Sequence, residues 1–357
     1  MIDFRNVDQW HIGNNEVEKV WLNGILVWEK FEVLNTTPFF VQNISEEDET
    51  LRIGKDLYAD DITIEYSTDG ITWGTLGTTS TAITRTLHVG EILYLRARTN
   101  RWCKYVSSQV GYYGNHISGV SRIGGNIFSL LYGSNFTGQE TSLPSYSNIF
   151  REIFRNNNKL IDASKLLLPA TSLMKSCYSY MFWGCNHLVY APPILPATVL
   201  ADYCYRYMFS GCNSLITTPT LPATTLAGAC YNAMFYRCYS LTNAPVLPAT
   251  TLVDGIDDGV WTGCYAGMFQ ECTSLVNAPE LPAPILTRYC YNQMFYGCTS
   301  LNYVKCLATD ISATNCTYAW MAEQQGTTGT FVKNPNMSSW PTGASGILSS
   351  WTVQDAT

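Results

Sequence analysis

The stretch LPATTLAGACYNAMFYRCYSL, residues 221–241, decides the fold of this chain because close copies of it follow one another. Copies begin at Leu168, Leu195, Leu221, Leu247 and Leu281, and a broken sixth copy begins at Leu307. These starting points are 27, 26, 26, 34 and 26 residues apart. A fixed period of roughly 20–50 residues is typical of solenoids. The repeat therefore predicts an elongated surface built by stacking, which favours a binding function over catalysis.

Apolar residues within each copy recur at positions i, i+4 and i+8. In the second copy these residues are Cys204, Met208 and Cys212, and Tyr205 and Phe209 form a neighbouring pair. Such spacing predicts one apolar stripe on a short helix. Three glycines stand just before the last cysteine of a copy, where a left-handed residue would end a helix at low cost. They are Gly184, Gly211 and Gly297.

The segment after each predicted helix favours a short strand. Residues 215–219 are too few for a helix and include residues with high β-propensity. The following Leu-Pro-Ala-Thr turns the chain, since proline disfavours helix at the residue before it. Thr225 and Thr251 are then placed to cap the next helix. Each unit is therefore predicted to be a short strand and a short helix joined by turns, which makes the array an α/β leucine-rich-repeat-like solenoid.

The repeat motif also resembles a known family. Cys204-Tyr205, Met208-Phe209, Cys212, Leu215 and residues 219–224 carry the likeness. They resemble the leucine-rich-repeat variant of surface proteins in gut Bacteroidales and of proteins in the phages that infect them. Residues 125–133 resemble the segment that opens such arrays, and residues 329–334 and 346–353 resemble the segment that closes them. The resemblance covers about two thirds of the chain and implies a solenoid used for surface recognition.

The first third of the chain shows no trace of the repeat. Residues 17–28 predict a β-hairpin, because Asn23-Gly24 lies between two apolar runs. Residues 12–17 and 20–24 are similar to the start of many phage tail and fibre proteins. From about residue 32, short alternating runs such as Ile92 to Ala97 predict an antiparallel β-sandwich. We expect Trp73 and Trp102 to belong to its core rather than to a sugar-binding surface.

These segments predict four parts. They are an N-terminal attachment hairpin (1–31), a β-sandwich (32–112), the solenoid (113–316) and a C-terminal capping segment (317–357).

Composition excludes several classes of protein. The chain has 357 residues, of which 46% are hydrophobic and 14% charged, so it is not largely disordered. A net charge of −7 argues against sequence-independent binding of nucleic acid, which needs a basic surplus. No apolar run reaches the length of a membrane span. The first six residues lack the basic and then apolar order of a secretory signal.

Thirteen cysteines raise the possibility of disulfides or zinc. Cys204 and Cys212 would lie roughly 12 Å apart along one helix, whereas a disulfide needs Cα atoms within about 7 Å. Neighbouring helices would lie roughly 8–10 Å apart, which also disfavours a disulfide ladder. No CxxC pair suggests zinc. We therefore expect reduced, buried, unmetallated thiols and folding in a reducing cytoplasm.

The sequence offers no catalytic constellation and implies no cofactor. It shows no phosphate-binding glycine loop, no well-spaced carboxylate pair and no Ser, His and Asp set. One acidic cluster, Asp254, Asp257 and Asp258, lies in the eight-residue insertion that lengthens the fourth repeat and carries Trp261. It is either a calcium site or a plain polar loop, and it lacks the ligand spacing of an EF-hand. Insertions in a solenoid lie in loops that often meet the ligand, so Trp261 and the three aspartates are candidate contacts.

A second candidate surface comes from variation between the copies. The stripe residues barely change, whereas one strand position varies between Tyr, Thr and Asn across five copies: Tyr190, Thr217, Asn243, Asn277 and Tyr303. Strand residues line the concave side of a leucine-rich solenoid, where partners usually bind. Drift at solvated positions would explain the same variation. The aromatic members suit carbohydrate or protein contacts.

Three functions remain open. The first is a non-enzymatic phage virion protein, associated with tail or fibre and assembled in the host cytoplasm. Its residues 1–31 would dock on other virion proteins, and its solenoid would recognise a host polysaccharide or outer-membrane component. The second is a bacterial cell-surface adhesin with the same repeats, and the third is a virion-borne glycan hydrolase. Virion appendages are commonly symmetric, so the first function implies a homo-oligomer without membrane insertion.

Overall fold

The computed structural model describes residues 33–106, 111–257, 261–323 and 328–357, together with the backbone of four short strands between residues 10 and 29. Two of these strands, β1 (Trp10–Ile12) and β2 (Asn15–Val17), pair antiparallel. The other two, β3 (Lys19–Leu22) and β4 (Ile25–Glu29), also pair antiparallel, with Leu22 opposite Ile25. The hairpin predicted at residues 17–28 is therefore confirmed as β3–β4, although its Asn23-Gly24 turn lies outside the described residues.

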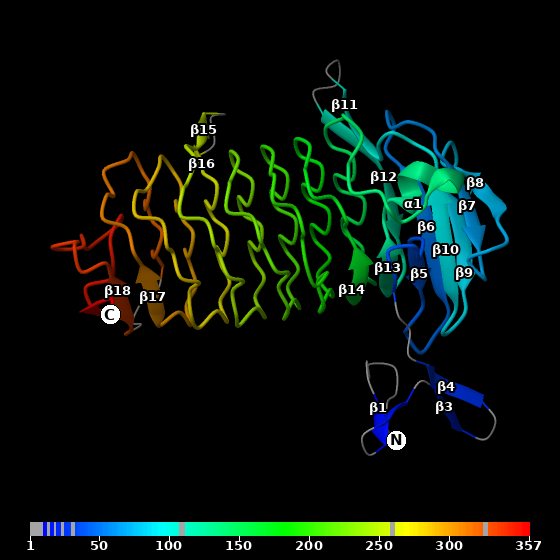
Figure 1. The fold of residues 1–357 in the computed structure, drawn as a ribbon, viewed down its shortest axis with the longest axis horizontal. Helices are drawn as coiled ribbons and strands as arrows, with labels where there is room; N and C mark the ends of the chain where they lie inside the picture. Colours follow the sequence, from blue (N-terminus) through cyan, green and yellow to red (C-terminus); the bar gives the residue numbers. More distant parts are fainter. Residues whose placement is uncertain are drawn as a thin grey trace.

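Two antiparallel-rich sheets follow and share one core (Figure 1). The six-stranded sheet has the order β14-β13-β5-β10-β7-β8, and the four-stranded sheet has the order β11-β12-β6-β9. The strands are β5 (Phe40–Gln42), β6 (Glu49–Lys55), β7 (Thr63–Ser67), β8 (Gly74–Thr78), β9 (Ile83–Leu87), β10 (Ile92–Ala97), β11 (Cys103–Val106), β12 (Gly111–Ser118), β13 (Arg122–Asn126) and β14 (Asp162–Leu167). Alternate residues of β6 and β10, such as Leu51, Ile53, Leu93 and Leu95, are fully buried, as the alternating sequence predicts.

The two tryptophans of this region behave differently. Trp102 is buried and donates its indole N–H to the carbonyl oxygen of Leu130 at 3.1 Å, so its predicted place in the core is confirmed. Trp73 is only half-buried, and the guanidinium of Arg96 lies over its ring at 4.2 Å. The ring of Trp73 is thus covered by a cation rather than by the core.

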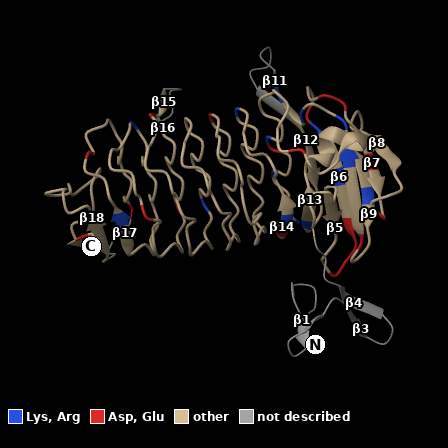
Figure 2. Cartoon of the chain, in the orientation of Figure 1, with Lys and Arg blue, Asp and Glu red and all other residues tan. Residues whose placement is uncertain are grey.

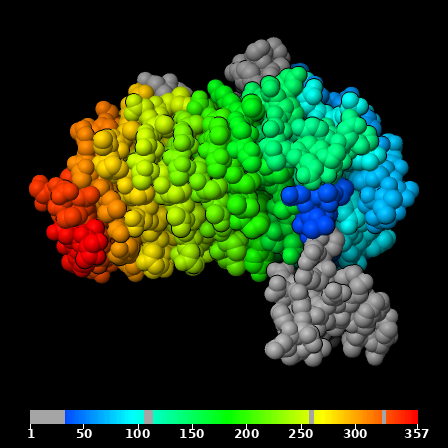
Figure 3. All heavy atoms as spheres, viewed as in Figure 1, coloured from blue at the N-terminus to red at the C-terminus, as the bar shows by residue number. Residues whose placement is uncertain are grey.

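Strand β13 joins the sandwich to the repeats. It pairs antiparallel with β5 on one side and parallel with β14 on the other, so one sheet passes from the first region into the second. Between β13 and β14 lie the short helices α1 (Ser129–Tyr132) and η2 (Gly133–Asn135). The repeats then lie side by side as successive coils, which appear as coloured bands from green to orange (Figures 1 and 3). We call residues 142–323 the repeat stack.

The predicted α/β leucine-rich-repeat-like solenoid is wrong, because the repeats contain no helix. In the described residues the only helices are α1 and η2, and neither belongs to a repeat. The segments predicted as helices, such as residues 203–212, are chains of turns. The predicted short strands are also mostly absent from the described repeats, where single bridges such as Asn243↔Asn277 take their place. The structure is mostly β-sheet and turn.

Alternate backbone N–H groups of each coil have different partners. Within the first full coil, Met181 N donates to Tyr178 O at 3.2 Å, three residues back, as in a β-turn. The residues between such donors bond to the next coil: Tyr178 N donates to Cys204 O at 3.0 Å, and Phe182 N donates to Met208 O at 2.8 Å. The hydrogen bond of every second N–H therefore closes a turn, and the bonds of the others join neighbouring coils. Together they give the buried N–H groups partners without a helix.

Left-handed residues recur every fourth position along these turns. Ser176 and Tyr180 have φ of 56° and 58°, and Gly184, four residues further on, has φ of 72°. The prediction of a left-handed glycine at 184, 211 and 297 is confirmed, but each glycine continues a chain of turns instead of ending a helix. Sixteen non-glycine residues in the described chain have positive φ, and all lie between 148 and 323. Each costs about 1–2 kcal/mol, so the bonds between coils must offset a large backbone strain.

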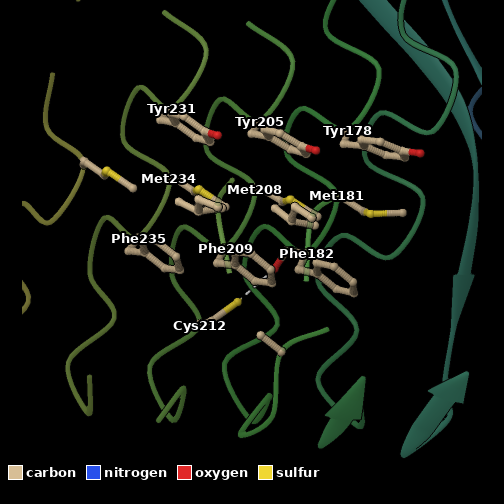
Figure 4. Close-up of a cluster of buried hydrophobic side chains, with 14 of the residues drawn as sticks. Tyr178, Met181, Phe182, Tyr205, Met208, Phe209, Cys212, Tyr231, Met234 and Phe235 are labelled. Carbon is tan, nitrogen blue, oxygen red and sulfur yellow. Dashed lines mark hydrogen bonds between the residues drawn. The ribbon is translucent and has the colours of Figure 1, made fainter. Parts of the chain in front are cut away.

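Predicted stripe residues form straight ladders through the stack. Tyr178, Tyr205 and Tyr231 stack with ring centroids 5.9 and 5.7 Å apart (Figure 4). A parallel ladder of phenylalanines includes Phe182 and Phe209, 5.2 Å apart, and runs on to Phe295. The methionines between the ladders, Met181, Met208, Met234, Met268 and Met294, are completely buried. Each coil thus buries its own apolar side against the coils before and after it.

Cysteine sulfurs form a further ladder. All thirteen cysteines are free and buried. Cys212 donates its S–H to Phe182 O of the preceding coil at 3.2 Å (Figure 4), and Cys238 does the same to Phe209 O at 3.2 Å. The predicted spacing of roughly 8–10 Å between neighbouring repeats was wrong. The repeats are hydrogen-bonded coils, and hydrogen-bonded neighbours lie about 4.8 Å apart. A small buried donor, rather than a long spacing, accounts for cysteine at this position.

The last coils end in a parallel sheet. Its strands are β17 (Tyr303–Cys306), β18 (Thr330–Lys333) and β19 (Thr352–Asp355), in that order. Trp320 packs against Tyr291, Phe295, Phe331 and Trp340, and so ends both aromatic ladders. In the insertion of the fourth repeat, β15 (Ile256–Asp257) and β16 (Trp261–Thr262) form a small antiparallel pair.

Candidate functional site

The five variable strand positions line up along the stack. Single parallel bridges join Asn243 to Asn277 and Asn277 to Tyr303, and Tyr190 bridges to Asp162 at the start of β14. Thr217 belongs to the same row, since its hydroxyl accepts a hydrogen bond from Ala191 N, next to Tyr190, at 2.8 Å. Asn243 and Asn277 are exposed, and the other three are half-buried. The structure therefore links Tyr190 with Thr217 in the first coils and Asn243 with Asn277 and Tyr303 in the later ones.

Each member of this row has a neighbour that widens the surface. We call residues 189–190, 216–217, 242–243, 276–277 and 302–303 the strip. Ile216 and Val276 of the strip are 47% and 37% exposed, which is high for large apolar side chains. The strip contains no charged residue. The repeat stack as a whole shows few charges compared with the sandwich (Figure 2). Hydroxyls, amides and apolar groups recurring at about 4.8 Å suit a neutral, extended ligand.

The insertion in the fourth repeat lies elsewhere. Figure 1 places β15 and β16 on the opposite side of the stack from β14 and β17, the strands that border the strip. Asp254 of the insertion accepts a hydrogen bond from Arg288 N at 3.0 Å, just as Asp202 accepts one from Gly228 N at 3.0 Å. Its carboxylate thus ties one coil to the next. The side chains of Asp257, Asp258 and Trp261 lie outside the described residues.

No group of three or more His, Cys, Asp or Glu side chains that could hold a metal ion occurs within the described parts of the chain. The interpretation of the Asp254 carboxylate as a calcium ligand therefore rests on the sequence cluster alone. The hydrogen bond from Arg288 N supports a structural role for this side chain.

The candidate residues named from the sequence missed a cluster of aromatic and cationic side chains on the first coils. Tyr180 and Tyr207, both at left-handed positions, stack with centroids 4.9 Å apart. Arg151 lies over the Tyr180 ring at 4.4 Å, and Arg206 lies 5.3 Å from the Tyr207 ring. Trp183 meets the edge of Tyr180 and is 40% exposed. The signal was available, because Tyr180 and Tyr207 occupy the same position of successive copies.

A second missed feature is an ionic network between the sandwich and the first coil. His116 contacts Asp56 Oδ2 through Nε2 at 3.0 Å and Glu152 O through Nδ1 at 2.9 Å. Arg155 bonds both Asp56, at 3.0 Å, and Glu152, at 2.6 Å. Burial alone would raise the pKa of Asp56, but hydrogen bonds from His116 and Gly114 and the charge of Arg155 hold it below its ordinary value.

The third missed feature is a pocket of about 410 Å³ at the junction of the sandwich and the first coils. Segments distant in sequence line it: the loop after β10, the end of α1 with η2, and Pro144. Because these segments meet only through tertiary packing, no local motif marks the pocket.

Comparisons with protein-family models, with curated proteins and with solved structures find no match to this chain. Among the helices that the structure describes, none combines the length and the apolar character that a bilayer-spanning segment requires.

Proposed function

We propose that this chain is a non-enzymatic virion protein of a phage, associated with tail or fibre, whose repeat stack recognises the host surface. The observation that carries the proposal is the strip. Five successive coils present three types of side chain, Tyr, Thr and Asn, at one fixed position, on a scaffold whose core residues are fully buried. A rigid row of variable groups, each exposed or half-buried, suits recognition because little conformational entropy is lost on binding.

The resemblance of the repeats to surface proteins of gut Bacteroidales and their phages supports the host-facing role. The likeness of residues 12–24 to the start of phage tail and fibre proteins supports attachment to other virion proteins through residues 1–31. The partner on the cell is a polysaccharide or an outer-membrane component, and the uncharged strip favours a neutral stretch of polysaccharide. A homo-oligomer would multiply weak contacts along such a polymer.

The test measures binding of purified protein to host cells. The double variant Asn243→Ala, Asn277→Ala removes two exposed amides from the middle of the strip, and we expect affinity to fall about tenfold, equivalent to roughly 1.4 kcal/mol. The matched control, Thr224→Ala with Thr250→Ala, removes two exposed hydroxyls from another column of the same coils. We expect the control to bind as the parent does and both variants to keep the melting temperature. Equal binding by the strip variant and the parent would contradict the proposal.

Deleting residues 1–31 separates the two proposed roles. We expect the shortened chain to bind cells and to be missing from purified phage particles. A bacterial adhesin with the same strip would show the first result, but its gene product would be found on the bacterial surface rather than in particles.

A further inference from the structure

The pocket at the junction has walls held together by hydrogen bonds. Arg98, just after β10, forms an isolated antiparallel bridge with Tyr132 at the end of α1. Thr99 N donates to Leu131 O at 3.2 Å, and the hydroxyl of Tyr132 donates to Ser142 O at 3.0 Å. The loop after β10, the helix and the segment before Pro144 are therefore fixed relative to one another. A site built in this way is largely formed before a ligand arrives.

The lining combines one cation with amides and an apolar wall. The polar side is Arg98, Asn100 and Asn135, and the apolar side is Leu131 and Pro144. No aspartate or glutamate lines the pocket.

Arg98 is exposed at the pocket and has no carboxylate within 4.0 Å among the described residues, and the same is true of Arg52 on β6. By contrast, Arg85 pairs with Glu91 at 2.9 Å and Arg96 with Glu65 at 2.7 Å. A guanidinium without an internal counter-charge favours a ligand that brings one, and its planar fork matches a carboxylate.

From this lining we infer that the pocket binds a carboxylated monosaccharide, the acidic unit of a surface polysaccharide. The carboxylate would pair with Arg98, the sugar hydroxyls with the amides of Asn100 and Asn135, and the apolar ring face with Leu131 and Pro144. A volume of about 410 Å³ lies at the lower end of the range for small-molecule sites, roughly 300–1,000 Å³, which suits one or two sugar rings. The inference deepens the proposed function, on which it rests, by naming an acidic unit beside the neutral stretch that the strip favours.

Calorimetric titration of the full chain with methyl glucuronide, with methyl glucoside and with inorganic phosphate tests the inference. We expect saturable binding of the glucuronide and at least about tenfold weaker binding of the other two ligands. The glucoside lacks the charge that would pair with Arg98, and phosphate lacks the sugar hydroxyls and the apolar ring face. Arg98→Ala should lose the glucuronide, whereas Arg98→Lys should keep part of the affinity. Arg52→Ala removes an exposed arginine of β6 and should bind as the parent does.

Three results would overturn the inference: no glucuronide binding, equal affinity for glucoside or phosphate, or unchanged affinity in Arg98→Ala. Unchanged melting temperature of Arg98→Ala shows that a loss of binding is not a loss of fold. Cell binding keeps this outcome separate from the proposed function. If the strip variant loses cell binding while the parent does not bind the glucuronide, only the pocket inference is contradicted. If the parent binds the glucuronide but no host cell, the proposed recognition function fails and the pocket stands.

Discussion

Replacing Gln293 with glycine and, separately, with alanine tests the turn structure of the repeats. Gln293 is half-buried, has φ of 53°, and bonds through its backbone N–H to Tyr318 O at 2.9 Å. Its sequence position, between Cys290 and Cys298, is where the spacing of apolar residues predicted the interior of a helix. In a helix and in a chain of turns, glycine changes the free energy of unfolding in opposite directions.

The magnitude follows from the backbone angle. A left-handed conformation costs an alanine about 1–2 kcal/mol, and glycine avoids that cost. Glycine loses more backbone freedom on folding, which offsets roughly 0.5–1 kcal/mol of the gain. The Gln293→Gly variant should therefore be more stable than Gln293→Ala by about 0.5–1 kcal/mol. In a helix interior, glycine would be less stable than alanine by about 1 kcal/mol.

Gln270 supplies the matched control. It lies in the preceding coil, is half-buried, and is absent from the residues with positive φ. There we expect glycine to be less stable than alanine by about 0.5–1 kcal/mol. Urea unfolding followed by circular dichroism gives the four free energies. The reasoning is refuted if glycine is the less stable choice at both positions, because residue 293 would then not need a left-handed backbone.

Three further predictions concern the ladders and the junction. The aromatic pair Phe209 and Phe235, with centroids 5.5 Å apart, should show a coupling energy of about 0.5–1.5 kcal/mol in a double-mutant cycle to leucine. Phe182 and Phe235 are separated by a coil, and their changes should add within about 0.5 kcal/mol; strong coupling there would contradict a ladder of nearest neighbours. Burial raises the pKa of Cys185 and Cys272 from 9.0 to about 12, so the contribution of these thiols to the free energy of unfolding should be constant below pH 9 and fall as pH rises from 9 towards 12. Replacing Cys185 with alanine should make that fall shallower in urea titrations, and an unchanged slope would argue against a buried thiol. The lowered pKa of Asp56 means that its contribution is present above pH 3.8 and is lost as pH falls further, so Asp56→Asn should destabilise at pH 7 and flatten the acid limb of the stability curve.

The spacing of apolar residues shows why the helices were predicted wrongly. Cys204, Met208 and Cys212 recur every four residues, and a helix repeats every 3.6. Over eight residues the helix would rotate these side chains by about 80° around its axis, whereas a four-residue turn returns each of them to the same direction. Both patterns bury the same residues, so burial of Met208 and Cys212 could be predicted while the backbone could not.

Prediction from sequence succeeded where the evidence was local. The strand Ile92 to Ala97 has the predicted bounds, since its buried and exposed positions alternate within six residues. The left-handed Gly184 was also marked by its own residue type. Left-handed Tyr180 and Gln293 carried no such mark, because their conformation is imposed by bonds to the next coil rather than by their side chains.

The same distinction separates the two candidate sites. Members of the strip could be named from sequence because a recurring motif makes position in the motif equivalent to position in space, whatever backbone the repeat adopts. Asn243 and Asn277 are 34 residues apart, and the insertion between them did not disturb their bridge, since it leaves the stack on the opposite side. Arg98 and Asn135 share no motif and meet only where β10 packs against the α1 segment. A pocket of that kind depends on the junction between two architectures, and only the three-dimensional structure brings its residues together.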